Sequence, residues 1–302
     1  MSAAGRGRRR ARASRLRSGF SFSTVAVGLS CEVGAIRATA SRAAQWQVNS
    51  VVERRCSNKG ESDGDAAFRE IKLMARSSNN IDVYLEIGNK RTFAGAIDWP
   101  GWCRSGRDEG SALQALFGYA PRYARVLRAA RLGFRAPVDT SAFAVIERLK
   151  GNATTDFGAP AVGPSSDARP VDDAELRRFQ ALLNACWRAF DVAAKAATGK
   201  ELRKGPRGGG RDLEGIVQHV LGADAGYLAR LAWQLKQSEK EDPGEALART
   251  RQAILNALAS TARGEVPARG PRGGVRWTPR YFVRRVAWHV LDHAWEIEDR
   301  IT

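Results

Sequence analysis

The C-terminal part of the chain repeats apolar residues with the period of an α-helix in four successive segments. In the first, over residues 172–199, large apolar side chains form one stripe that a core can bury, namely Leu176, Phe179, Leu183, Trp187 and Phe190. The first segment opens on Asp172 or Asp173 as a cap, and the other three begin after residues suited to cap a helix, which are Asp212, Asp242 and Thr278. Proline follows two of these caps, at the helical position that favours it most. The pattern predicts an all-α four-helix bundle over residues 172–302.

A different pattern precedes the bundle. Residues 81–98 alternate apolar and polar positions around Gly88-Asn89, a hairpin signal, and residues 143–151 have the composition of another strand. Between them, a helix can begin at Asp108 or Ser111. The order strand, strand, helix, strand predicts a small α+β domain over residues 79–151.

Residues 152–171 are rich in Pro, Gly, Ala and Ser and show no periodicity. Such a composition is typical of a connection between domains. We therefore expect residues 152–171 to be a linker between the α+β domain and the bundle.

Residues 1–73 differ from both of these regions in their charge and in their lack of periodicity. They hold 14 basic and 6 acidic residues, a net charge of +8, and the first 17 residues include seven Arg and no acid. Three interpretations stay open, which are sequence upstream of a true start at Met74, a disordered basic arm, and a targeting peptide. No periodic segment in this stretch could pack against the rest of the chain. We therefore expect residues 1–73 to be dispensable for folding.

The whole chain carries a formal net charge of +17, which raises nucleic-acid binding as a rival function. Nearly half of that charge belongs to residues 1–73, and the remainder is dispersed among Asp and Glu, as on a solvated surface. No apolar run approaches the roughly 18 residues needed to span a bilayer. The four Cys, at positions 31, 56, 103 and 186, form no C-x-x-C pair. We expect a cytoplasmic protein without a membrane partner, and we rank nucleic-acid binding below the other functions.

All three histidines of the chain fall on predicted helices of the bundle. His289 and His293 are four residues apart on the last helix, so they project from one face and can bind a divalent ion together. His219 is on the second helix, which can pack beside the last one and supply a third imidazole. A single helical histidine is more often a core or surface residue than a ligand. Three imidazoles with an open fourth position, however, are typical of a catalytic zinc-type site.

Two acidic residues flank the histidine pair on the last helix. Glu296 falls within about 60° of both histidines on a helical wheel, which makes it a candidate fourth ligand or general base. Asp292 lies at the edge of the same face and is a candidate acceptor for an imidazole N–H. Either carboxylate can instead face solvent or pair with an Arg.

The order of the helices and the histidine spacing, with "AWHVLDHAWEIEDR" as the last helix, resemble the DinB-like (YfiT-type) metal-binding proteins over about residues 171–302. The resemblance implies an up-down-down-up bundle with a metal centre, and in some members a thiol-dependent transferase or isomerase activity. It implies no particular substrate.

Upstream, the turn Asp98-Trp99-Pro100-Gly101-Trp102 runs into "SGRDEGSALQAL". Together with the order of strands and helix, this turn resembles HicB-like α+β domains over about residues 79–151. The resemblance implies no catalytic residue in this part of the chain, which also contains no His.

Two loops share a string. "KGPRGGGRD" (204–212) precedes the second helix of the bundle and "RGPRGGVRW" (269–277) precedes the last, which could be the trace of a duplicated helix pair. Arg207 and Arg272 are candidate contacts for a phosphate or carboxylate, because they lie next to helix N-termini. The alternative is that both strings are flexible connectors.

Together these features predict a protein that binds a divalent metal. Zinc is expected first, and nickel, iron or copper also suit three imidazoles. The leading interpretation is a metal-dependent enzyme that activates water or a low-molecular-weight thiol toward a small-molecule substrate, as a transferase, isomerase or hydrolase. Two alternatives rank below it, a non-catalytic metal-binding regulatory bundle and a nucleic-acid-binding regulator that uses the HicB-like domain. A homodimer also stays open.

Overall fold

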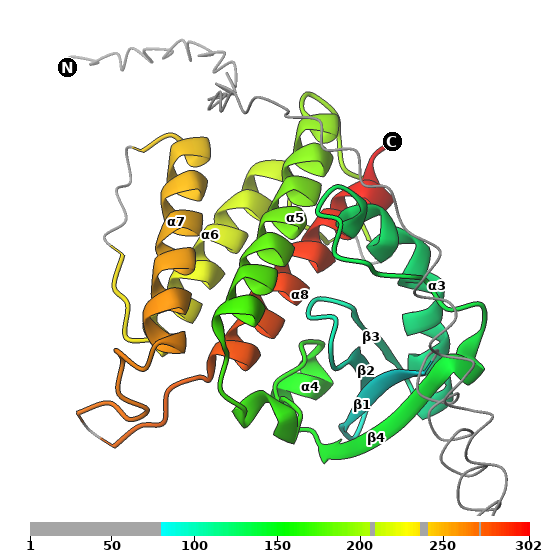
Figure 1. Cartoon of the computed structure of the whole chain (residues 1–302). Helices are drawn as coiled ribbons and strands as arrows, with labels where there is room; N and C mark the ends of the chain where they lie inside the picture. Colours follow the sequence, from blue (N-terminus) through cyan, green and yellow to red (C-terminus); the bar gives the residue numbers. More distant parts are fainter. Residues whose placement is uncertain (1–79, 206–208, 236–240, 272) are drawn as a thin grey trace, which may run out of the picture. The chain divides into compact units, whose positions relative to one another are not determined.

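The computed structural model describes residues 80–205, 209–235, 241–271 and 273–302, and these described residues all belong to one compact unit. The expectations for residues 1–73 lie outside them. In chain order, and as labelled in Figure 1, the main elements are β1 (Ile81–Ile87), β2 (Thr92–Ala96), β3 (Cys103–Gly106), α3 (Glu109–Arg128), β4 (Phe143–Lys150), α4 (Ala153–Phe157), α5 (Asp173–Ala197), α6 (Leu213–Arg230), α7 (Pro243–Ala262) and α8 (Pro279–Arg300).

The first elements form a four-stranded mixed sheet in the order β3-β2-β1-β4. β1 and β2 are the predicted antiparallel hairpin, closed by a 2.9 Å hydrogen bond from Gly88 N to Arg91 O, and β4 returns parallel to β1. The predicted α+β order is confirmed, with one additional strand. The sequence did not predict β3, because its four residues, CRSG, do not alternate apolar and polar positions.

α3 follows the sheet and starts with a capping box. Asp108 accepts a hydrogen bond from Ser111 N at 2.7 Å, and the Ser111 hydroxyl accepts one from Asp108 N at 3.1 Å. Both residues that the sequence offered for this start therefore take part in it. The helix packs on the sheet through the fully buried Trp102, whose indole N–H donates to Leu116 O at 2.9 Å.

The four predicted helices of the bundle form with their predicted caps. α5 follows Asp172, α6 follows Asp212, α7 follows Asp242 and α8 follows Thr278, and each cap side chain accepts a hydrogen bond from a backbone N–H of the first turn. The four helices lie side by side in Figure 1. The prediction of an all-α bundle after an α+β sheet is therefore confirmed.

α5 and α8 run parallel. Their starts meet in the ion pair between Glu175 and Arg280, and their ends meet in a 2.7 Å backbone hydrogen bond from Arg203 N to Arg300 O. Residues just beyond the two helices, Leu202 and Ile301, also form a β-bridge. The first and last helices of the bundle therefore point the same way.

α6 and α7 run in the opposite direction. Trp277 N, just before α8, donates at 3.3 Å to Arg230 O at the end of α6, so α6 ends where α8 begins. Arg263, directly after α7, lies within electrostatic range of Asp173 in the first turn of α5. The bundle therefore has the expected up-down-down-up topology.

Residues 152–171, expected to be a linker, are packed against the sheet and the bundle. They contain α4 and a short 3-10 helix, η2 (Ser165–Ala168). Fully buried Glu86 on β1 accepts hydrogen bonds from the Thr155 hydroxyl and, at 2.9 and 3.0 Å, from Ala161 N. Composition did not indicate this packing, because the polar partners come from residues far away in the sequence.

α8 is buried on nearly every side. Fourteen of its 22 residues are buried, whereas a helix at the surface buries a single stripe. The guanidinium of Arg284 pairs with Asp167 of η2 at 2.7 and 2.9 Å, and it also donates to Ala96 O and Ile97 O at 2.8 and 3.1 Å. Both side chains of the ion pair are at most 7% exposed. This contact joins α8 to the sheet and to η2.

Breaking this ion pair should destabilise the whole unit. We expect Asp167→Ala to lower the free energy of unfolding by about 3–5 kcal/mol, because it leaves the Arg284 charge buried without its partner. Urea denaturation followed by circular dichroism measures this change. As a matched control, Glu265→Ala removes the exposed partner of Arg263 and should change stability by less than about 0.5 kcal/mol. A loss below about 1 kcal/mol for Asp167→Ala would contradict the role given to the pair.

Candidate metal centre

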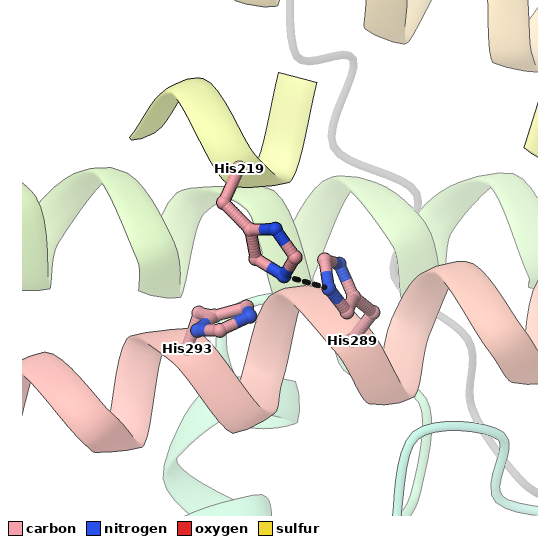
Figure 2. A group of neighbouring side chains, drawn as sticks. All are labelled: His219, His289 and His293. Atoms are coloured by element: carbon pink, nitrogen blue, oxygen red, sulfur yellow. Dashed lines mark hydrogen bonds between the residues drawn. The ribbon is translucent and has the colours of Figure 1, made fainter. Parts of the chain in front are cut away.

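Three imidazole rings meet between α6 and α8. Figure 2 shows His219 reaching from α6 toward His289 and His293, which project from successive turns of α8. The ring centroids are 4.6 Å apart for His289 and His293, 4.9 Å for His219 and His293, and 5.0 Å for His219 and His289. One nitrogen of each ring lies within 4.8 Å of the other two. The predicted convergence of the three histidines is confirmed.

The nitrogen positions fit a divalent ion. The Nε2 atoms of His219 and His289 are 3.2 Å apart, and two nitrogen ligands at about 2.0–2.1 Å from one tetrahedral ion are separated by about 3.4 Å. Among the residues that the structure describes, no other group of three or more His, Cys, Asp or Glu side chains comes together in this way. The donor set of three imidazoles suits zinc and the other borderline transition metals.

The surroundings favour the neutral imidazoles that a metal requires. His289 and His293 are buried, and His219 is partly exposed. Burial, followed by the nearby His293 and His219, lowers the pKa of His289 to about 2. Burial and the charge of Arg211 also lower the pKa of His219. Protons therefore compete weakly for the nitrogens of these two rings.

Glu296 lies behind His293. Its carboxylate is 2.7 Å from His293 Nδ1, and its other oxygen accepts a hydrogen bond of 2.5 Å from Arg300. The hydrogen bond with His293, followed by the Arg300 contacts, lowers the pKa of Glu296, so the carboxylate is charged. A proton on Nδ1 would be donated to this carboxylate, which leaves Nε2 of His293 free to bind an ion. The contact supports an orienting role for Glu296, whereas the sequence offered a fourth ligand or a base.

Asp292 lies on a different side of α8. It forms an ion pair of 2.8 Å with Arg104 on β3, and in the described part of the chain no hydrogen bond joins it to a histidine of the cluster. Arg104 also lies over the ring of Tyr119, 3.9 Å from its centroid. In this structure Asp292 therefore connects α8 to the sheet.

The two loops with a shared string have the same hydrogen bond between equivalent glycines. Gly205 N donates to Gly209 O at 2.8 Å, and the equivalent Gly270 N donates to Gly274 O at 2.8 Å. This match agrees with a duplicated connector ahead of α6 and α8. Arg207 and Arg272, the candidate anion contacts, lie outside the described residues.

Two residues that the sequence analysis did not select also border the cluster. The ring of Tyr227 lies 5.7 Å from that of His289, centroid to centroid, and its hydroxyl accepts a hydrogen bond of 3.2 Å from Arg285. Tyr227 comes eight residues after His219 on α6, and Arg285 comes four residues before His289 on α8. These spacings are close to whole helical turns, so they could have indicated both residues.

Comparison of the chain with protein-family models, with curated proteins and with solved structures finds no match. In the part of the chain that the structure describes, no helix combines the length and the apolar character required to cross a membrane.

The contact of Glu296 with His293 predicts a role in metal affinity. We expect Glu296→Gln to weaken metal binding by about tenfold while the bundle stays folded, because the change removes the charge that holds the imidazole proton. Titration of the metal-free protein with zinc, in competition with a chelator, measures this affinity. Glu298→Gln is the matched control, since Glu298 pairs with Arg122 on the opposite side of α8. Equal zinc affinity in the wild type and Glu296→Gln would show that Glu296 pairs with Arg300 but does not contribute to metal binding.

Proposed function

We propose that this protein binds one divalent metal ion, zinc in the first place, through His219, His289 and His293, and that it is a metal-dependent enzyme. The single observation that carries the proposal is the convergence of one nitrogen from each histidine within 4.8 Å of the others. With three protein ligands, a fourth position is open to water or substrate, as in catalytic sites.

The resemblance to the DinB-like proteins supports the same proposal. The up-down-down-up bundle carries one histidine on its second helix, α6, and a pair four residues apart on its fourth, α8. By analogy with that family, the reaction is the transfer or isomerisation of a small molecule with a low-molecular-weight thiol. The analogy identifies neither the thiol nor the electrophile.

A bound divalent ion would supply one kind of chemistry, lowering the pKa of a water or thiol or polarising a carbonyl. The residues of the chain prepare the site for it. Glu296, held by Arg300, fixes the orientation of His293. The rings of Tyr227 and Trp288 pack near His289, with centroids 5.7 and 6.1 Å from that of its imidazole.

A non-catalytic metal-binding bundle is the second candidate, and it uses the same three histidines. The open coordination position favours an enzyme over a purely structural site, because structural zinc is almost always held by four protein ligands. Turnover separates the two candidates, since only an enzyme would convert a panel of electrophiles with low-molecular-weight thiols in a metal-dependent way.

Metal content tests the proposal directly. We expect elemental analysis of the purified wild type to give one divalent ion per chain, and each of His219→Ala, His289→Ala and His293→Ala to give well below one. Circular dichroism checks that the variants are folded, and Glu298→Gln serves as a control with unchanged metal. A variant that keeps one ion per chain would exclude that histidine from the site, and a metal-free wild type would end the proposal.

A further inference from the structure

Two buried side-chain nitrogens, one on Arg285 and one on His289, have no hydrogen-bond partner among the described residues. Arg285 is 8% exposed, and its Nε forms no hydrogen bond. His289 is 6% exposed, and its Nδ1 likewise has no partner. A buried donor without an acceptor costs about 1–3 kcal/mol, so such groups are rare in the absence of a ligand or water.

The state of His289 makes its Nδ1 a donor in the loaded site. Its Nε2 faces His219, and a neutral imidazole that uses Nε2 as a ligand carries its proton on Nδ1. For His293, Glu296 lies against the corresponding nitrogen. Among the described residues, His289 has no such carboxylate. The acceptor for its N–H must therefore come from outside this part of the chain.

Arg285 is well placed to share that acceptor. It precedes His289 by one helical turn on α8, so the two side chains are neighbours on one face. Its Nη1 donates to Pro160 O and its Nη2 to the hydroxyl of Tyr227 at 3.2 Å, which holds the guanidinium beside the ring that borders His289. The Nε–H of Arg285 therefore remains available to donate to an acceptor.

The excess of positive charge around the cluster also favours binding of an anion. Arg285 and Arg211 both place positive charge close to His289. The acidic group that contacts the cluster, Glu296, is already shared between His293 and Arg300. A divalent ion would add two further positive charges to this environment.

From these contacts we infer that Arg285, with Tyr227, binds an oxyanion of the substrate, a carboxylate or phosphate, beside the three-histidine centre. The inference rests on the proposed metal site and names the class of molecule that the site accepts. The guanidinium is suited to this because it presents planar N–H donors to carboxylate and phosphate oxygens. Arg285 is thus a substrate-binding residue that selects anionic substrates.

Anion binding to the cobalt-loaded protein tests the inference without an activity assay. The wild type is loaded with Co²⁺ to one ion per chain and titrated with acetate, inorganic phosphate and neutral acetamide, and the visible cobalt absorption and the heat of binding are recorded. We expect one or both oxyanions to bind at least about tenfold more tightly than acetamide, and the preferred one identifies the group. Arg285→Gln should weaken oxyanion binding by about tenfold. Arg188→Gln, an exposed Arg on α5, should leave it unchanged.

The results distinguish a failure of oxyanion binding at Arg285 from a failure of metal binding at the three histidines. Cobalt bound at one ion per chain, with equal oxyanion affinity in the wild type and Arg285→Gln, would overturn this inference and leave the metal site intact. No cobalt uptake by the wild type would overturn the proposed function and this inference with it. If Arg285→Gln does not fold, Tyr227→Phe decides, because it removes the hydroxyl that holds the guanidinium and should weaken oxyanion binding by about threefold. Unchanged affinity in Tyr227→Phe would then overturn the inference.

Discussion

The buried ion pair between Arg284 and Asp167 fixes the helix on which the rest of the structure depends. Arg284 lies in the second turn of α8, and its guanidinium is held at once by η2 and by the carbonyl groups of Ala96 and Ile97 at the end of β2. A charge buried this deeply tolerates few alternative positions, because every displacement would leave it without a partner. The sheet and η2 therefore set where α8 lies, and His289 and His293 follow five and nine residues further along the same helix.

The third histidine is less buried than the other two. His219 is partly exposed and comes from α6, whose start is tied to the end of α8 by the 2.7 Å hydrogen bond from Arg300 to Arg211 O. The same Arg300 holds Glu296, which contacts His293. One guanidinium therefore links the loop before α6 to the orientation of a ring on α8. The site combines two buried imidazoles on α8 with a third whose position depends on how α6 packs.

Much of this arrangement can be predicted from the sequence. The caps Asp172, Asp212, Asp242 and Thr278 mark the helix starts because capping is a local interaction, decided within one turn. The histidines identify their own site, because they are few and their spacing matches the helical period. The hairpin around Gly88-Asn89 is predictable for the same local reason.

The sequence could not predict what depends on distant partners. Two adjacent Arg in an amphipathic pattern suggest a solvated edge, yet Arg284 and Arg285 are buried because residues 152–171 supply a carboxylate and a carbonyl. On a helical wheel, both Glu296 and Asp292 were candidates for a role beside the histidines. They differ in the structure because one faces the histidine cluster and Arg300, and the other faces Arg104 of the sheet. Periodicity indicates which face a residue occupies, whereas its partner follows from the packing of other elements.

X-ray absorption spectroscopy of the zinc-loaded protein tests the central claim most directly. The account predicts a first shell of three imidazole nitrogens at about 2.0–2.1 Å and one oxygen from water, with no sulfur. The outer-shell scattering of imidazole should be lost in part when His219 is replaced by Ala. A first shell that contains sulfur, or fewer than two imidazoles in the wild type, would contradict a metal centre built from His219, His289 and His293.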